Sequence, residues 1–205
     1  MNKKRGFTLT EVLITMGVIG IISALTVPTL MNNYQQKALA IQIRKAVLDF
    51  ETQVDLQITE EGKSNMAATN IKTQAGFVTF LREHFKVTRT CAQGNASGCF
   101  ADQSYLSISG TSTNFNCASE SYLLSNSVAI CPTKAAGSVT YDLYIDVNGS
   151  EGPNIGGRDM FHVSLRPDGK IHDTAAAAGI ASCTGDSFGA GCLDRLQQNS
   201  WVMNY

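Results

Sequence analysis

Hydrophobic and polar positions divide the first part of the chain into two successive helical patterns. Residues 7–31 are apolar or small apart from one carboxylate, Glu11. A helix of this length extends about 37 Å, which is enough to cross the roughly 30 Å hydrocarbon core of a bilayer. Residues 32–61 are amphipathic instead, with apolar side chains at spacings of three and four: Leu39, Ile43, Ala46, Val47, Phe50, Val54 and Ile58. The pattern predicts an apolar helix that continues as the spine of a folded domain and ends near Gly62, where a left-handed cap is available.

Residues 62–205 carry shorter patterns that predict one globular head. Residues 63–73 are polar and small, typical of a linker, and residues 74–85 place apolar side chains on one face of a short helix. Four strands are expected at 122–131, 139–147, 160–166 and 170–172, the last two joined by a Pro-Asp-Gly turn. A long helix followed by an antiparallel sheet predicts an α+β fold.

Charge sets the direction of insertion. Lys3, Lys4 and Arg5 precede the apolar helix and favour a cytoplasmic N-terminus, with the head outside the membrane. Without these three residues the chain has 13 cationic and 17 acidic side chains, so its formal net charge changes from −1 to −4. This mild acidity argues against electrostatic capture of nucleic acid. Pro28 lies inside the helical pattern, where its missing N–H predicts a kink or local unwinding.

The segment Lys4-Arg5-Gly6-Phe7-Thr8-Leu9-Thr10-Glu11 has small Gly6 before the apolar run, whereas a general signal peptide has its cleavage site after it. This segment closely resembles the prepilin-type start of type IV pilins and type II secretion pseudopilins. The resemblance covers about the first 30 to 55 residues. It implies that residues 1–6 are a leader, that a prepilin peptidase cuts after Gly6, and that the new N-terminal residue, Phe7, is methylated. Pilin-like proteins often carry a proline where this chain has Pro28.

Glu11 is a carboxylate within a segment expected to lie in a bilayer, where an ionisable residue points to function. It lies four residues after Phe7 and near a helix N-terminus, which favours a negative charge. It could neutralise the Phe7 amine of its own chain or of a neighbour. The resemblance implies that Glu11 pairs with the Phe7 amine of the adjacent subunit during filament assembly. The alternative is a glutamate that only snorkels to the membrane edge.

Six cysteines fit the oxidising side of the membrane, and none of them forms a Cys-x-x-Cys motif. Fifteen pairings exist, and the sequence does not select one strictly. We favour nearest neighbours, because each pair then closes a loop rich in Gly, Ser or Asn. These pairs are Cys91–Cys99, Cys117–Cys131 and Cys183–Cys192.

Residues 146–159 form the most distinctive loop of the head. Asp146 and Asn148 begin like a calcium loop, but Glu151 and Gly157 occupy positions where the EF-hand pattern requires Gly and Glu. An irregular oxygen cage for calcium would use Asp146, Asn148, Glu151 and Asp159. The favoured alternative is a connection in which Asp146 or Asp159 accepts hydrogen bonds from turn amides. Some pseudopilins, the proteins that this chain resembles, carry calcium in their C-terminal β region.

Three classes of function remain to be weighed: a structural filament subunit, a membrane-anchored binding module such as an adhesin or DNA-uptake pilin, and a tethered enzyme. Nucleophile and metalloprotease motifs such as Gly-x-Ser-x-Gly and His-Glu-x-x-His do not occur, and no basic stripe with interleaved aromatics is present. We therefore expect a non-enzymatic pilin, minor pilin or pseudopilin, located in the bacterial cytoplasmic membrane and then in an extracytoplasmic filament. The resemblance implies as partners homologous subunits, prepilin peptidase and an assembly platform in the cytoplasmic membrane. No resident cofactor is expected apart from the calcium alternative.

Overall fold

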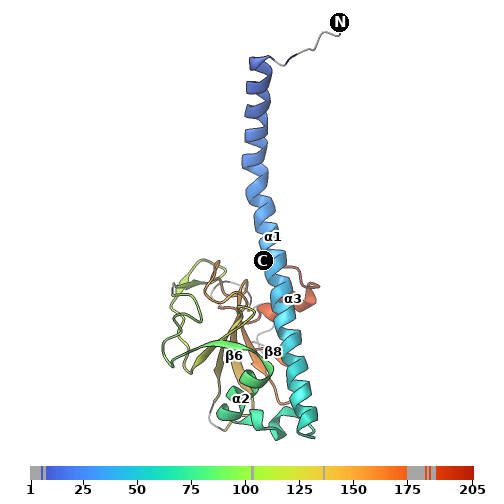
Figure 1. Cartoon of the computed structure of the whole chain (residues 1–205), viewed down its shortest axis with the longest axis vertical. Helices are drawn as coiled ribbons and strands as arrows, with labels where there is room; N and C mark the ends of the chain where they lie inside the picture. Colours follow the sequence, from blue (N-terminus) through green and yellow to red (C-terminus); the bar gives the residue numbers. More distant parts are fainter. Residues whose placement is uncertain are drawn as a thin grey trace. The chain divides into compact units, whose positions relative to one another are not determined.

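The computed structural model describes residues 6, 8–102, 104–135, 137–174, 183, 185 and 188–205. Its contacts divide the chain into two compact units, Met1–Ala38 and Leu39–Tyr205. The long helix α1 (Leu9–Glu60) belongs to both units (Figure 1). The larger unit contains a helix packed on an antiparallel sheet, so the predicted α+β fold with a long N-terminal helix is confirmed.

Helix α1 ends where its sequence predicts. Gly62 has a φ of +61°, in the left-handed region that favours glycine. The Gly62 N–H donates to the Thr59 carbonyl (3.0 Å), and the Lys63 N–H donates to the Ile58 carbonyl (2.9 Å). These two bonds satisfy carbonyls that the last turn leaves without helical partners.

The segment after α1 is more ordered than a linker. It contains two single-turn 3₁₀ helices, η1 (Met66–Ala68) and η2 (Asn70–Lys72). Thr69 and Thr73 cap the elements that follow them by accepting backbone N–H bonds on their hydroxyl oxygens. The expected short helix is α2 (Gln74–His84). The linker prediction missed η1 and η2 because three-residue turns leave no periodic pattern.

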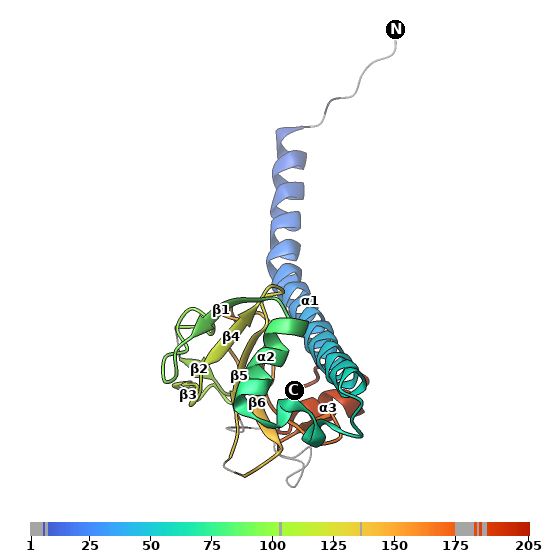
Figure 2. The ribbon, with the colours of Figure 1, turned by 60° about the horizontal axis from the view of Figure 1, so that its bottom comes forward.

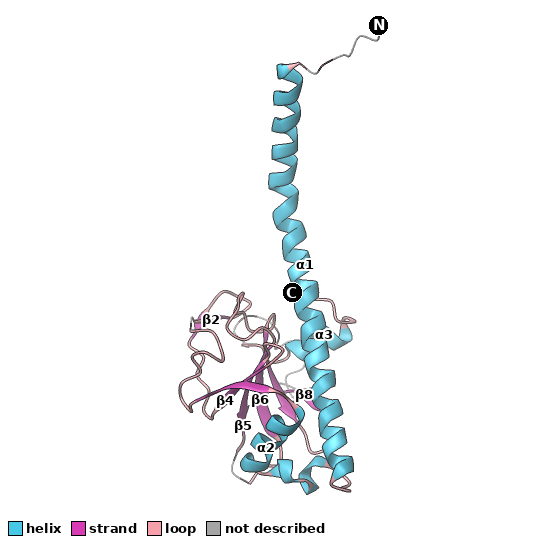
Figure 3. Cartoon of the chain, in the orientation of Figure 1, coloured by secondary structure: helices cyan, strands magenta, loops and turns pink. Residues whose placement is uncertain are grey.

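The sheet contains six strands within the described residues, all paired antiparallel in the order β1-β4-β5-β6-β7-β8 (Figures 2 and 3). They are β1 (Val87–Cys91), β4 (Ser121–Leu124), β5 (Ala129–Thr133), β6 (Tyr141–Asp146), β7 (Met160–Leu165) and β8 (Ile171–Asp173). A separate pair comprises β2 (Tyr105–Leu106) and β3 (Ser112–Thr113). Helix α3 (Cys192–Gln198) follows β8.

One of the four expected strands was wrong. The segment 122–131 is a hairpin of β4 and β5 rather than one strand, and it reverses at Ser127, whose φ is 67°. The Leu124 N–H donates to the Val128 carbonyl (2.9 Å) and closes this turn. Polar Ser125-Asn126-Ser127 is the local signal that the apolar flanks obscured. The other three strands and the Pro-Asp-Gly turn were predicted within a few residues.

The core lies between α1 and one face of the sheet. Alternate residues of β6 are buried and more exposed, as its sequence predicts. Phe50 of α1 is 2 % exposed and stacks on Phe85 with ring centroids 5.1 Å apart. Tyr141 of β6 stacks on Phe77 of α2 at 4.4 Å. The Phe50 and Phe77 rings are 6.2 Å apart, so aromatic contacts join α1, α2 and the sheet.

The other face of the sheet carries a second apolar cluster, which contains two of the disulfides, whereas Cys183 and Cys192 belong to the main core. All six cysteines are among the described residues, and they form Cys91–Cys99, Cys117–Cys131 and Cys183–Cys192. Each bond joins cysteines that are neighbours in the sequence. The loop-entropy model gives roughly 3 kcal/mol of stabilisation for a closed loop of about 15 residues.

Candidate assembly site

The candidate assembly site begins at the N-terminal end of α1. Gly6 is exposed, and a Cβ added to it meets no atom within 4 Å. An unobstructed backbone at Gly6 is compatible with access by a peptidase. Phe7, the expected methylation site, and the cations Lys3, Lys4 and Arg5 lie outside the described residues.

Glu11 lies in the first turn of α1 and forms a reciprocal cap with Thr8. The Glu11 carboxylate accepts bonds from the Thr8 backbone N–H (2.8 Å) and from its hydroxyl (2.8 Å). The Thr8 hydroxyl oxygen in turn accepts a bond from the Glu11 N–H (3.3 Å). This is a capping box, which satisfies donors that a helix N-terminus leaves free. Sequence reasoning missed Thr8, although Thr-x-x-Glu before an apolar run is the signature of that motif.

The cap holds the carboxylate in a defined place. Its contacts come from Thr8, only three residues away, and both residues are exposed. The charge is therefore held at the helix end and is not enclosed by the described part of the chain. Such a group can exchange a local donor for an external cation, because a charge-assisted hydrogen bond to an amine is stronger than one to a neutral donor.

The helix behind this cap presents apolar side chains on its surface. Leu13, Ile19 and Leu25 are 63 %, 63 % and 73 % exposed. A Cβ added at Gly17 or Gly20 meets no atom within 4 Å, so these positions also face open space. Within the described chain, α1 is long and apolar enough to cross a membrane. An exposed apolar surface of this size requires lipid or other apolar helices around it.

Pro28 lies inside α1, and the helix continues on both sides of it. The residues around it are helical, so the structure shows no local unwinding at Pro28. The kink remains a prediction.

The proposed calcium ligands make other contacts in the structure. Asp146 is buried, and its Oδ2 accepts a bond from the Tyr105 hydroxyl (2.6 Å) while its Oδ1 accepts one from the Asn148 N–H (3.1 Å). Glu151 is exposed. The four proposed ligands are all described, yet no three acidic, histidine or cysteine side chains of the described chain form a group that could hold a metal ion.

Asp159 organises the loop through backbone amides, which is the favoured alternative from the sequence. Its carboxylate accepts from the N–H groups of Asn154 (2.5 Å) and Ile155 (2.7 Å). Burial raises the pKa of Asp159 to about 6, although these amide bonds lower it. Burial, followed by the charge of Asp159, raises the pKa of Asp146 well above its ordinary range. The Oδ1 atoms of Asn148 and Asn154 are buried without a hydrogen-bond partner among the described residues.

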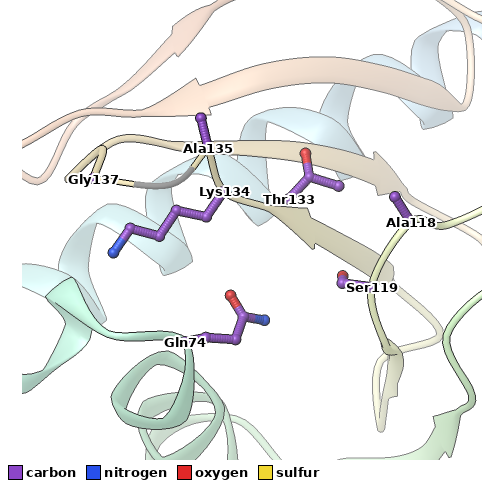
Figure 4. A pocket seen from close by; sticks show the side chains of 7 residues that line it. All are labelled: Gln74, Ala118, Ser119, Thr133, Lys134, Ala135 and Gly137. Carbon is purple, nitrogen blue, oxygen red and sulfur yellow. The ribbon is translucent and has the colours of Figure 1, made fainter.

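A surface hollow of about 430 Å³ lies beside the start of α2 (Figure 4). The described part of its lining is Gln74, Ala118, Ser119, Thr133, Lys134, Ala135 and Gly137. The Lys134 ammonium donates to the Lys72 carbonyl and lies 5.1 Å from the centre of the Tyr141 ring. Its charge is thus already engaged within the head, and the hollow gives no specific support to a binding module.

The fold and the site together define a class of protein. An apolar helix carries a capped carboxylate in its first turn, follows a short cationic start, and continues into a disulfide-stapled α+β head. This combination is a pilin-like architecture whose apolar helix fits a membrane anchor.

Comparison with known proteins finds a family match at the N-terminus of the chain. Residues 1–27 match the family described as the prokaryotic N-terminal methylation motif. A similar protein is the prepilin peptidase-dependent protein D of Escherichia coli (strain K12), which is 37 % identical over 62 residues. That alignment covers 30 % of this chain and 42 % of the relative, so the chain matches less than half of the relative's length. No solved structure matches the chain. The chain carries the prepilin-type methylation motif, and the matches support a subunit of the pilin and pseudopilin kind.

Proposed function

We propose that this chain is a structural subunit of a type IV pilus or of a type II secretion-type filament. In this proposal a prepilin peptidase removes residues 1–6, Phe7 becomes the methylated N-terminus, and residues 7–31 anchor the subunit in the cytoplasmic membrane. Residues 32–61 and 62–205 form the head outside. The methylation motif and a relative whose name records dependence on prepilin peptidase support this reading.

The observation that carries the proposal is the position of Glu11. It is a carboxylate in the first turn of an exposed apolar helix, and it is held by Thr8 without being enclosed. Processing would create an α-amine on Phe7, a cation in an apolar setting. An amine and a carboxylate from adjacent subunits would neutralise each other there, and the low dielectric would strengthen their attraction. Pairing would thereby favour the assembled state.

Two substitutions separate pairing from capping. Glu11→Gln retains an oxygen that can accept from Thr8 but removes the charge, whereas Glu11→Ala removes both. The experiment expresses each variant with prepilin peptidase and an assembly system, then measures processing, membrane insertion and sheared filament yield. Thr15→Ala in the same helix is the control, since its hydroxyl only bonds back to the Val12 carbonyl (3.0 Å).

Both Glu11 variants are expected to insert and to be cut, yet to lose filament yield by roughly tenfold or more, which corresponds to about 1.4 kcal/mol. Filament yield with Glu11→Gln equal to that of the wild type would show that the cap alone matters and that no charge pair forms. Wild-type-like yield with both variants would remove Glu11 from assembly altogether.

A further inference from the structure

The turn at the start of the 146–159 loop contains an asparagine followed by a glycine, Asn148-Gly149, and no other Asn-Gly pair occurs in the sequence. The Glu151 N–H donates to the Asn148 carbonyl (3.3 Å), so residues 148–151 form a turn directly after β6. Asn-Gly is a strong turn signal, because both residues tolerate left-handed backbone conformations. It is also the pair that shields an asparagine amide least from the next backbone nitrogen, since glycine places no side chain beside that nitrogen.

The fold requires glycine at position 149. Its φ is +66°, in the left-handed region, and a Cβ added there would lie 2.9 Å from the Ser127 carbonyl oxygen and 3.1 Å from Leu123 Cδ1. Any larger residue would therefore strain the backbone and collide with the turn between β4 and β5. The pair can change only at position 148, so the head keeps an Asn-Gly pair for as long as it has Asn148.

The Asn148 side chain is only partly restrained. Its Nδ2 donates to the Gly152 carbonyl (2.9 Å) at an exposed position, whereas its Oδ1 is buried without a hydrogen-bond partner among the described residues. A reaction at the amide carbon would therefore break one hydrogen bond, on the side that water can reach. The Asn148 N–H donates to Asp146 Oδ1 (3.1 Å), and the Gly149 N–H interacts with the same carboxylate. The Gly149 nitrogen thus faces a group that can accept its proton.

We propose that Asn148 is a site of spontaneous deamidation in the folded head. The Gly149 nitrogen attacks Asn148 Cγ to form a cyclic succinimide, the Cγ–Nδ2 bond breaks, and ammonia leaves with the proton that Gly149 gives up. Water then opens the ring at either carbonyl. The product is aspartate, or isoaspartate where the backbone continues through the side-chain carbonyl. Water is the only other reactant, and no atom is oxidised or reduced.

Both products change a buried acidic cluster. Aspartate at position 148 would add a carboxylate beside buried Asp146 and Asp159, and it would lose the bond from Nδ2 to the Gly152 carbonyl. Like charges repel strongly where the dielectric is low. Isoaspartate would instead lengthen the backbone and displace Gly149 from its tight packing. Deamidation is thus expected to loosen the loop and to add one negative charge to each modified head, whether or not the chain forms the proposed filament.

The first test measures conversion in the folded protein. The full chain, in detergent micelles with its disulfides intact, is incubated in mildly alkaline buffer, digested and analysed by peptide mass spectrometry. Asn154 is the matched control: it lies in the same loop, its Oδ1 is also buried without a partner among the described residues, and β-branched Ile155 follows it. Asn148 is expected to convert at least about tenfold faster than Asn154. Asn148→Gln should stay unmodified, because its longer side chain disfavours ring closure.

The same chain, reduced and unfolded in denaturant, provides the reference rate without the turn. Three outcomes overturn the proposal. Conversion of Asn148 in the unfolded chain but not in the folded chain would show that the turn protects the amide. Equal conversion of Asn148 and Asn154 in the folded chain would show that the Asn-Gly pair has no special role. An unmodified Asn148 in both states would show that the reaction does not occur there.

The second test measures the consequence with stable variants. Asn148→Asp introduces the deamidated side chain into every molecule, and Asn148→Ser removes the amide without adding charge. Asn148→Asp is expected to have the lower Tm at neutral pH, and the difference should shrink in acid, where the added carboxylate becomes protonated. Equal Tm values at neutral pH would show that the cluster tolerates the added charge, and the expected loosening by aspartate would then be wrong.

Discussion

Asp159 makes the stability of the head depend on pH in a direction that the structure fixes. Burial raises its pKa to about 6 from an ordinary value of 3.8. Between these values the folded chain binds more protons than the unfolded chain, so stability falls as pH rises. The difference corresponds to about 2.4 kcal/mol between pH 4 and pH 7.5. For a unit of this size that is a change in Tm of roughly 5–10 °C.

The assay follows thermal unfolding of the full chain in detergent micelles with its disulfides intact. Trp201, the only tryptophan, provides the fluorescence signal. Asp159→Asn removes the titrating group, and Asp102→Asn changes an exposed carboxylate as the control. His162 acts in the opposite direction: burial lowers its pKa, so the stability of the folded chain declines as the pH falls below 6.5. The comparison between variants therefore isolates Asp159.

The wild type and Asp102→Asn are expected to share one pH dependence, and Asp159→Asn to lose part of the gain at low pH, because Asp146, whose pKa is also raised by burial, contributes the remainder. The reasoning is refuted if Asp159→Asn keeps the wild-type slope, because the carboxylate would then titrate at its ordinary value. A wild-type head that is more stable at pH 7.5 than at pH 4 in this comparison also contradicts it, unless His162→Gln reverses that order.

Three further outcomes are expected. Phe50→Ala should lower the free energy of unfolding by about 3–5 kcal/mol, because it leaves a cavity among stacked rings, whereas Leu48→Ala should change it by less than about 0.5 kcal/mol; equal effects in denaturant titrations would contradict the assigned core. Thr8→Val should speed amide hydrogen exchange in the first turn of α1 by removing a cap bond that stabilises it by about 1 kcal/mol, with Thr15→Val as the control. Calcium at millimolar concentration should leave the Tm unchanged; a clear rise would show that the 146–159 loop holds the cation after all.

The long helix and the hairpin of β7 and β8 could be predicted because their signals are local. The end of α1 follows from Gly62, and the turn follows from Pro167, Asp168 and Gly169, whose φ is +81°. The alternation in β6 likewise reports a strand with one buried face. In each case the residues that determine the element lie within it.

Other features depend on partners that are distant in the sequence. The buried carboxylate of Asp173 in β8 accepts the Leu193 N–H (2.9 Å) at the start of α3, so it stabilises a helix 20 residues away. Asp146 similarly accepts a hydrogen bond from the hydroxyl of Tyr105, 41 positions earlier. No local pattern reports such contacts, and in the sequence Asp146 is a candidate calcium ligand.

The central claim concerns processing at the start of α1, and the most direct test is the intact mass and the N-terminal residue of the protein. The full chain is expressed with a prepilin peptidase, extracted from membranes and analysed by mass spectrometry. The expected product begins at methylated Phe7 and retains the apolar helix. A chain that keeps Met1, or one cut beyond Val27, would contradict the proposal that this helix is exposed by processing and used for assembly.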